Sequence, residues 1–553
     1  MTNERIIKMS KGFDIKDYAL HETGAEFSVS DPAVQYVFDR CEQLCRENIQ
    51  RFGDRWVLKE GAKYNGVWLE TQPMGGEMYA SRNMEVALNN HLIFMNNQRR
   101  DGRVPGMIRY APPWMGVTMH YDWFQGDFFT VSAMRMYYLI GKDKGYLRRL
   151  YDFLRDFDDY LWKYRDSDGD GCLEAWCIWD TAEDNSTELT ANGVHATENG
   201  AWCGETPPTD HGKMPYESAA YMAYSYSHLI TLHRISVILE NGEEEEWLNK
   251  AERVRERAIE YLWDNEKKAF YDRDRNDERI DCFTQKNIKC MYHGLFTQEM
   301  ADEFIALHLL NPDEFNTYLP LPSIAANDPL FYLTKERNNL SPEVYETVRR
   351  YMGGDMLDNS WSGPCEGLTY QRSIDALLRY GHHAEMTDFG RRFIENLYRE
   401  KRFVQQYDPF TGKASPGDDG YGPTMLAALE YITHLYGVDY ACDRLTWSSL
   451  GDGSESVFSQ KLFGDIYTLK RSKDGCSVAE KNGQRLFSFS AGIRIVTDMS
   501  GEVIWVYGAE NRTLNAALFT ARGRYSFTAE PNCRYALSDD GIRLAERVRC
   551  DMV

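Results

Sequence analysis

The sequence lacks the marks of a membrane-spanning or secreted protein. No apolar run approaches the ~18 residues that a bilayer-spanning helix needs. The first residues, MTNERIIKMSKGFDIKDYAL, contain no apolar core of the kind that secretory signals carry. The 12 cysteines are scattered and form neither a C-x-x-C knuckle nor a regular framework. We therefore expect reduced thiols in a cytoplasmic protein, with no zinc or other metal site and no cofactor.

Positive charge is also scarce. The chain of 553 residues has 85 Asp and Glu against 63 Lys and Arg, a formal net charge of -22. Such a surface repels nucleic acid and anionic membranes, so neither is an expected partner. Aromatic residues make up 13% of the chain, which suits both a large core and a site where sugar rings stack on aromatic faces. The oligomeric state is left open, a homo-oligomer included.

Helical periodicity dominates the chain from about residue 33 to residue 437. Helices are predicted near residues 33–50, 77–98, 127–141, 144–164, 214–240, 245–266, 284–293, 297–309, 341–352, 367–381, 383–400 and 423–437. Apolar stretches alternate with stretches charged on one face, which predicts inner and outer helices paired in a ring. The long links 165–213 and 310–335 are rich in Gly, Pro, Asp and Trp, and we expect them around a cleft at one end of that ring.

The pattern changes after Tyr440. Segments such as SVFSQKLFGDIYTLKRS and GEVIWVYGAE are short, rich in β-branched and aromatic residues, and separated by Gly, Asn and Asp. This is typical of antiparallel strands. We predict a helical domain over residues 1–440 and a small β-sandwich domain over residues 441–553.

One stretch, RDSDGDGCLEAWCIWDTAEDNST, is unusually acidic. Asp166, Asp168 and Asp170 followed by Gly171 match the first half of an EF-hand loop, but the twelfth position, which should be a bidentate Glu, is Cys177. The alternative is an Asp-Gly turn that ends the preceding helix. A weak calcium site stays open as the less favoured interpretation.

The second half of that stretch, WDTAEDNST (Trp179 to Thr187), resembles W-E-S-G-x-D-N-S-P, the signature of six-hairpin glycosidases of the mannosylglycerate hydrolase and processing α-glucosidase I group. Further motifs follow in the group's order: YNGVWLETQ resembles V-W-x-R-D-T, with Glu70 where Asp is usual; QRRDGRVPG matches Q-x-x-x-G-x-I-P; NSWSGPCEG resembles Y-W-R-G-P-x-W, with Ser362 for Arg; FVQQYDPFTG resembles F-x-E-Q-Y-D-P-x-T-G. Together they span about residues 60–437. The resemblance implies an (α/α)6 toroid that hydrolyses α-glycosidic bonds with inversion.

Inversion needs one protonated and one ionised carboxyl on opposite sides of the bond. The resemblance makes Asp184 the proton donor, and the charges of Asp180 and Glu183 would help to keep it protonated. The alternative is that Asp184 caps a short helix. Residues expected to bind the sugar are Trp68, Glu70, Trp123, Gln125, Asp127, Trp179, Asp180, Trp361 and Tyr407.

The group's catalytic base falls on Gln405, whose amide cannot take a proton from water at neutral pH. Three accounts are open. The chain is a Glu→Gln variant of an active enzyme, the interpretation we favour; another carboxylate serves as base, with Glu366, Asp418 and Asp419 as candidates; or phosphate replaces water, for which no clear basic cluster is visible.

The function expected from the sequence is an inverting, exo-acting α-glycosidase of a small α-glucoside or α-mannoside. An α-L-rhamnosidase-like hydrolase and a sugar-binding relative that no longer hydrolyses are the alternatives.

Overall fold

The computed structural model describes residues 14–111, 116–184, 186–192, 207, 213–332, 341–342, 361–538 and 541–545. Its helices are η1 (Ile15–Asp17), α1 (Pro32–Glu47), α2 (Gln72–Met78), η2 (Tyr79–Ser81), α3 (Met84–Met95), α4 (Thr130–Leu139), α5 (Lys144–Tyr164), α6 (Thr187–Ala191), α7 (Ala219–Leu239), α8 (Glu244–Leu262), α9 (Lys286–Tyr292), α10 (Gln298–Phe304), η3 (Ile305–Leu309), α12 (Gly367–Arg379), α13 (His383–Glu400) and α14 (Gly422–Tyr436). The predicted helix at 341–352 lies almost wholly outside the described residues.

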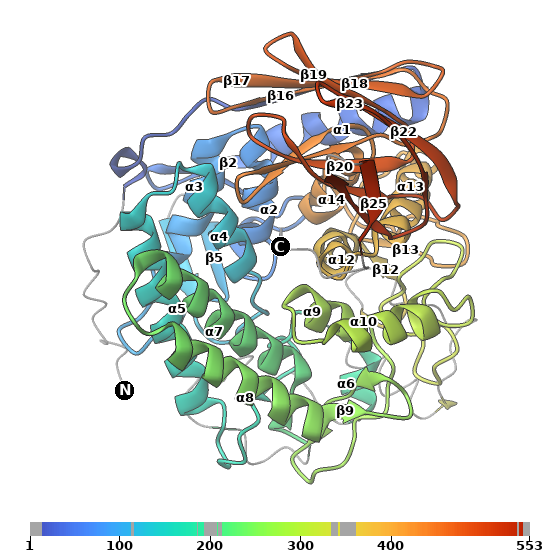
Figure 1. The fold of residues 1–553 in the computed structure, drawn as a ribbon. Helices are drawn as coiled ribbons and strands as arrows, with labels where there is room; N and C mark the ends of the chain where they lie inside the picture. The colour runs from blue at the N-terminus through green and yellow to red at the C-terminus, as the bar shows by residue number, and fades with distance from the viewer. Residues whose placement is uncertain are drawn as a thin grey trace.

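Six of the described helices contact one another in a closed order. Helix α2 contacts α4, α4 contacts α7, α7 contacts α9, α9 contacts α12, α12 contacts α14, and α14 returns to α2. We call these six the ring helices (Figure 1). Helices α3, α5, α8 and α13 pack outside them, against α2, α7, α7 and α12 respectively. The ring helix α7 is buried along most of its length, whereas α8 buries one face only, as the sequence pattern predicts.

The single helix predicted at 77–98 is wrong. A 3-10 turn, η2, follows α2, and α3 begins only after Asn83. The backbone of Asn83 is extended and its side chain accepts a hydrogen bond from the Val86 amide at 3.1 Å. An Asn that caps a helix in this way starts a new helix and interrupts the old one.

The C-terminal part consists of two antiparallel sheets. One has the order β1-β16-β17-β18-β19-β22-β23 and the other β14-β15-β20-β21-β24-β25. Their strands are β1 (Gly24–Val29), β14 (Val438–Ala441), β15 (Arg444–Ser448), β16 (Ser456–Leu462), β17 (Asp465–Arg471), β18 (Cys476–Lys481), β19 (Gln484–Ser490), β20 (Ile493–Asp498), β21 (Val503–Gly508), β22 (Leu514–Thr520), β23 (Gly523–Ala529), β24 (Arg534–Ser538) and β25 (Gly541–Leu544). The Trp447 ring lies 6.2 Å from Tyr467 and 5.5 Å from Phe487, so the two sheets pack on each other.

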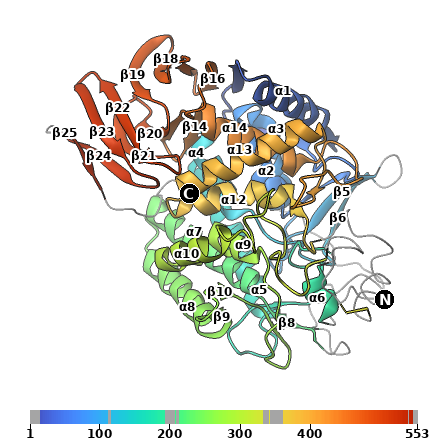
Figure 2. The ribbon, with the colours of Figure 1, turned by 90° about the vertical axis from the view of Figure 1, so that its right-hand side faces the viewer.

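One strand of these sheets comes from the other end of the chain. Strand β1 pairs antiparallel with β16 along its whole length, from Gly24 opposite Lys461 to Val29 opposite Ser456. The division into domains at 440 and 441 therefore stays a proposal, with β1 placed in the sheet of the second part. Figure 2 shows the sheets on one side of the helices and the short helix α6 on the other.

Short two- and three-stranded sheets lie in the links between helices. They contain β2 (Ile49–Phe52), β3 (Arg55–Leu58), β4 (Gly66–Trp68), β5 (Met107–Ala111), β6 (Gly116–His120), β7 (Glu174–Ala175), β8 (Tyr216–Glu217), β9 (Trp263–Asp264), β10 (Ala269–Phe270), β11 (Arg273–Asp274), β12 (Cys365–Glu366) and β13 (Gln406–Tyr407). Among the described residues, no helix is both long and apolar enough to cross a membrane.

Candidate active site

Most residues expected at the site lie just before, or in the first turns of, the ring helices. Glu70 precedes α2, Gln125 precedes α4, Glu366 precedes α12, and Gln405 lies in the link before α14. Asp184 lies in the link that ends in α6. Because N-terminal ends of helices carry unpaired N–H groups and a partial positive charge, polar and acidic groups are well accommodated there.

Asp184, Gln125 and Glu70 form one hydrogen-bonded group. The Gln125 amide nitrogen donates to Asp184 Oδ1 at 3.1 Å and to Glu70 Oε1 at 3.3 Å. Gln125 has a φ of 61° and Ala182 a φ of 64°, a left-handed backbone that non-glycine residues adopt only when their surroundings hold them there. The link before α4, which contains Gln125, and the link before α6, which contains Ala182 and Asp184, are thus held in position where Gln125 contacts Asp184.

The environment of Asp184 suits a proton donor. Burial raises the pKa of Asp184 to about 6, against the opposing effects of the Gln125 amide and the Lys289 charge. The predicted cause is wrong, because the charges of Asp180 and Glu183 are taken up by other partners. Glu183 forms an ion pair with Lys289 at 3.0 Å. The helix-capping alternative for Asp184 is also wrong, since Ser186 caps α6.

Asp180 does not face a sugar. Its Oδ2 accepts from Arg165 at 2.6 Å and from the Trp176 amide at 2.9 Å, and its Oδ1 accepts from the Phe124 amide at 3.0 Å. Burial would raise the pKa of Asp180, but the Arg165 charge and these hydrogen bonds hold it below its usual value. Both oxygens of Asp180 are bonded to protein partners that hold the links of the site in place, so these contacts give no support to its predicted role in sugar binding.

Two further assignments change for the same reason. Asp127 Oδ2 is bonded to His228 Nε2 at 2.6 Å, and Asp127 Oδ1 accepts from the Phe129 amide at 3.0 Å. The hydroxyl of Tyr407 is fully buried, donates to the Arg402 carbonyl at 2.8 Å and accepts from the Val404 amide at 3.1 Å. The polar atoms of both side chains are thus bonded to partners within the protein, so these contacts give no support to their predicted role in sugar binding.

Of the four predicted tryptophans, Trp361 contacts Asp184 through its backbone, and the other three pack against aromatic neighbours. The backbone N–H of Trp361 donates to the Asp184 carbonyl at 3.2 Å, so the segment before α12 is tied to the acid's own link. Trp123 and Trp179 pack with ring centroids 5.5 Å apart. Trp68 makes an edge contact with Tyr64 at 5.6 Å. The side chains of Trp68, Trp123 and Trp179 are partly buried and that of Trp361 is buried, and their stacking against sugar stays a prediction.

Two of the candidate positions, Glu366 and Gln405, lie at a small two-stranded sheet. Strand β12 pairs with β13, which places Glu366 opposite Gln406, and the Gln406 amide donates to Glu366 Oε1 at 2.5 Å. The neighbouring Gln405 accepts at its amide oxygen from the Tyr64 hydroxyl at 2.7 Å. Asp419 accepts from the Phe403 amide at 2.5 Å, which is a structural contact.

Sequence reasoning missed Glu60. It is 4% exposed, accepts a hydrogen bond from Tyr421, and interacts electrostatically with Asp184. Burial, reinforced by the Asp184 charge, raises the pKa of Glu60 to about 8. Its backbone carbonyl accepts from the Gly422 amide at 2.6 Å, which anchors it to the start of α14. Nothing in the stretch KEGAKYNGVW marks this Glu, because its partner Tyr421 is more than 300 residues away in the chain.

The same reasoning missed two buried cations. Arg372 of α12 pairs with Glu70 Oε2 at 3.3 Å. Lys289 of α9 pairs with Glu183 and lies 5.9 Å from the Trp361 ring. Both lie in the second turns of ring helices, where apolar periodicity gave no reason to single out a charged residue.

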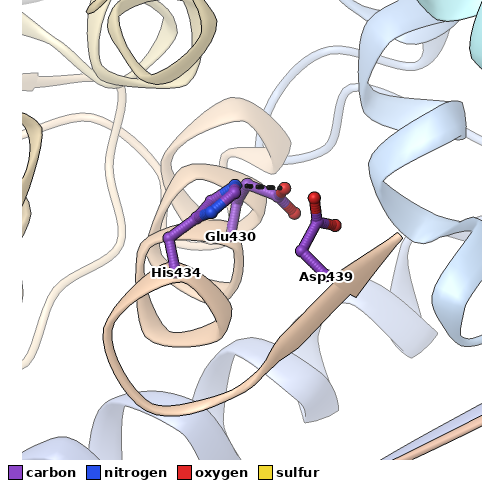
Figure 3. Close-up of side chains that lie close together, drawn as sticks. All are labelled: Glu430, His434 and Asp439. Atoms are coloured by element: carbon purple, nitrogen blue, oxygen red, sulfur yellow. Dashed lines mark ion pairs between the residues drawn. The ribbon is translucent and has the colours of Figure 1, made fainter. Parts of the chain in front are cut away.

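Three groups of side chains within the described residues have the spacing of metal ligands. One is Glu430, His434 and Asp439 (Figure 3). His434 Nε2 lies 3.2 Å from Glu430 Oε1. Burial alone would lower the pKa of His434, but Glu430 and Asp439 raise it, so an imidazolium and its carboxylates account for the cluster without an ion.

The other two groups share Asp168, one with Asp166 and Asp170, the other with Glu174 and Glu217. In the first, Asp168 Oδ1 accepts from the Asp170 amide at 3.1 Å, and Asp170 Oδ2 pairs with Arg257 at 2.8 Å. Gly171 has a φ of 84°. These are the contacts of the Asp-Gly turn that the sequence predicts as the alternative to calcium.

A carboxyl group with a raised pKa, held beside tryptophans where several helices begin, is typical of carbohydrate-cleaving enzymes. The profile of the mannosylglycerate hydrolase MGH1-like glycoside hydrolase domain matches residues 77–423, so the chain belongs to this family and is a glycoside hydrolase. The resemblance found in the sequence is thereby confirmed. Among curated proteins, no sequence matches the chain.

Solved structures are similar at low identity. The GH63 mannosylglycerate hydrolase from Thermus thermophilus in complex with glucose is 18% identical over 72% of this chain and 99% of that chain, with a TM-score of 0.55. The same enzyme in complex with Tris and D-glycerate is 17% identical over 72% of this chain and 100% of that chain, with a TM-score of 0.55. A protein described as a sialidase is 13% identical over 87% of this chain and 43% of that chain, with a TM-score of 0.61. At these identities the likeness concerns the fold alone.

Proposed function

We propose that the protein is an inverting, exo-acting α-glycosidase of a small α-glucoside or α-mannoside, with Asp184 as proton donor. The observation that carries this is the contact of Asp184 with Gln125 and Trp361 in an environment that raises its pKa to about 6. The closed order of contacts among the ring helices supports a six-hairpin (α/α)6 toroid. A cleft at one end of such a toroid is the natural place for this chemistry.

We infer that Glu60, which no motif indicates, provides the second carboxyl. A proton acceptor is needed because Gln405 has an amide where the family has a carboxylate. Tyr421 donates to Glu60, and its ring lies 5.9 Å from Tyr64, which holds Gln405. The Glu60 carboxyl is therefore two aromatic side chains from position 405. It also interacts with Asp184, so the two carboxyls resist being ionised together.

The pair has the proton count that inversion requires. Between pH values of about 6 and about 8, the raised pKa values of Asp184 and Glu60 leave one proton on the pair. With these values the proton lies mostly on Glu60, so the reactive form is the minor arrangement of that proton, in which Asp184 is protonated and Glu60 is ionised. In that form Asp184 gives its proton to the leaving oxygen and Glu60 accepts one from water. Water attacks the anomeric carbon as the glycosidic bond breaks, and the configuration inverts.

Proton NMR tests the proposed stereochemistry. The first sugar released from an α-glycoside should be the β-anomer, since the reaction is a single displacement. An initial α-anomer would indicate a covalent intermediate and would contradict inversion.

A binding protein without hydrolytic activity is the second candidate, and Gln405 is the observation that favours it. A panel of aryl α-glucosides, α-mannosides and α-L-rhamnosides separates the two, because turnover of any one of them excludes a protein that only binds.

A further inference from the structure

A cavity lies beside α4 and α7, where α9 and α12 end. Its volume is about 380 Å3, and its wall is formed by α4, the C-terminal half of α7, and the residues His293, Arg379 and Cys442. His293 directly follows α9, and Arg379 is the last residue of α12. Val237, in the same wall, is 53% exposed, so the cavity reaches solvent. None of the groups assigned above to glycoside cleavage lines it.

Basic side chains gather in the wall of this cavity. It contains the three arginines Arg135, Arg234 and Arg379 and the two histidines His233 and His293, and the described residues that line it include no Asp or Glu. This is unusual in a chain whose net charge is -22. Arg135 forms ion pairs with Asp375 at 2.6 Å and Glu77 at 3.5 Å.

His293 is the clearest sign of a ligand. It is 3% exposed, and neither ring nitrogen has a hydrogen-bond partner in the part of the chain that the structure describes. Leaving a buried polar group unpaired costs about 1–3 kcal/mol, so such groups usually have a partner. Burial lowers the pKa of His293 well below its usual value, and the positive charges of Arg379 and His228 lower it further. The ring lies in a positive field that a bound anion would relieve.

The remaining wall suits a small organic molecule. Ser227 and Thr231 of α7 supply hydroxyls, and Val131, Met134 and Ile230 supply apolar surface. The volume is at the lower end of the range of ~300–1,000 Å3 typical of small-molecule sites. Arginine forks match the oxygens of phosphate and carboxylate groups.

We propose that this cavity binds a small organic anion, whose phosphate or carboxylate group is held by Arg234, Arg379 and His293 and whose body packs against α4 and α7. This site is separate from the glycosidase chemistry. Failure of either proposal therefore leaves the other standing.

Isothermal titration of the full chain tests the site, with inorganic phosphate, glycerol 3-phosphate and malate as probes at matched ionic strength. We expect saturable binding of at least one probe, with one site per chain. The probe that binds identifies the headgroup as phosphate or carboxylate. Absence of saturable binding by all three overturns the proposal.

Two variants locate the binding. Arg234→Gln, at an exposed position of α7, should weaken binding about tenfold, the loss expected for one charged hydrogen bond. The matched control is Arg391→Gln on α13, also exposed, which removes the same charge away from the cavity and should bind normally. Equal weakening by both variants would mean general attraction to the surface and would overturn the site.

His293→Leu separates a ligand group from a structural one. Because both ring nitrogens lack partners among the described residues, the variant should melt at the same or a higher temperature without ligand, and it should lose most of the binding. A variant that melts lower and binds as the parent does would show a structural histidine only, and would contradict the proposal.

Discussion

The two ends of the ring helices differ in the charge they collect. Glu70 lies just before α2, and Arg379 is the last residue of α12. Helix dipoles favour these two placements, since acidic groups are stabilised at helix N-termini and basic groups at C-termini. The same set of helices can therefore carry an acid–base site at one end and an anion site at the other.

Within the N-terminal end, a second difference decides the chemistry. Asp180 and Asp127 have cationic partners, Arg165 and His228. The Asp184 carboxyl instead accepts its hydrogen bond from the neutral amide of Gln125. The Arg165 charge holds the pKa of Asp180 below its usual value, whereas burial raises the pKa of Asp184 to about 6 and brings it closer to neutral pH, where the carboxyl can give up a proton.

The largest effect is expected from Asp184→Asn. Hydrolysis of substrates with poor leaving groups should fall ~10²–10⁴-fold, the usual contribution of a general acid. Activated aryl glycosides should suffer less, because their leaving groups need little protonation. Steady-state rates on both substrate types measure this, and phosphate binding at the other end should not change. Parent rates with poor leaving groups would remove Asp184 from the chemistry.

The second effect concerns the proton acceptor. Glu60→Gln should lower hydrolysis at least ~10²-fold, because the amide cannot accept a proton. Gln405→Glu should change the rate little if Glu60 already acts. The rates of both variants on one aryl glycoside show whether Glu60 or position 405 provides the proton acceptor. An increase of ~10² or more in Gln405→Glu, with Glu60→Gln harmless, would return the role to position 405.

Asp180→Asn tests the supporting carboxylates. It leaves Arg165 fully buried without its carboxylate, and breaking a buried ion pair costs about 3–5 kcal/mol. Chemical denaturation should show this loss of stability, whereas Asp184→Asn should unfold at the parent concentration of denaturant or above it. Equal stability of the two variants would contradict the distinction between supporting and reacting carboxylates.

The pH profile should show a smaller effect of the same pair. Below a pH of about 6 both Asp184 and Glu60 are protonated and no acceptor remains, whereas above about 8 both are ionised and no donor remains. Hydrolysis should therefore be greatest between these values and fall about tenfold per pH unit outside them. Initial rates across acidic, neutral and alkaline pH measure both limbs. A profile that stays flat well above a pH of about 8 would contradict the need for one proton on the pair of Asp184 and Glu60.

Local patterns predicted some of these features and missed others. Asp184 was found because its motif is contiguous, and the strands after residue 440 because their alternation is short-ranged. Asp180 and Asp127 were misassigned because their partners are 15 and 101 residues away. Glu60 and strand β1 were missed for the same reason. A single sequence shows which carboxylates exist, but their burial and their partners in space decide their pKa values.

The smallest effect is expected from removal of metal ions. In the turn at Asp166 to Gly171, the carboxylates accept from backbone amides, with the Gly171 amide donating to Asp166 at 3.3 Å and the Cys172 amide donating to Asp170 at 2.7 Å. Arg257 takes the remaining oxygen of Asp170 at 2.8 Å. Cys177, which stands where a calcium loop needs its bidentate Glu, is buried and supplies no carboxylate. EDTA should therefore change neither the melting temperature nor the rate of hydrolysis. A fall of several degrees with EDTA, reversed by calcium and absent in Asp168→Asn, would show that the turn binds calcium.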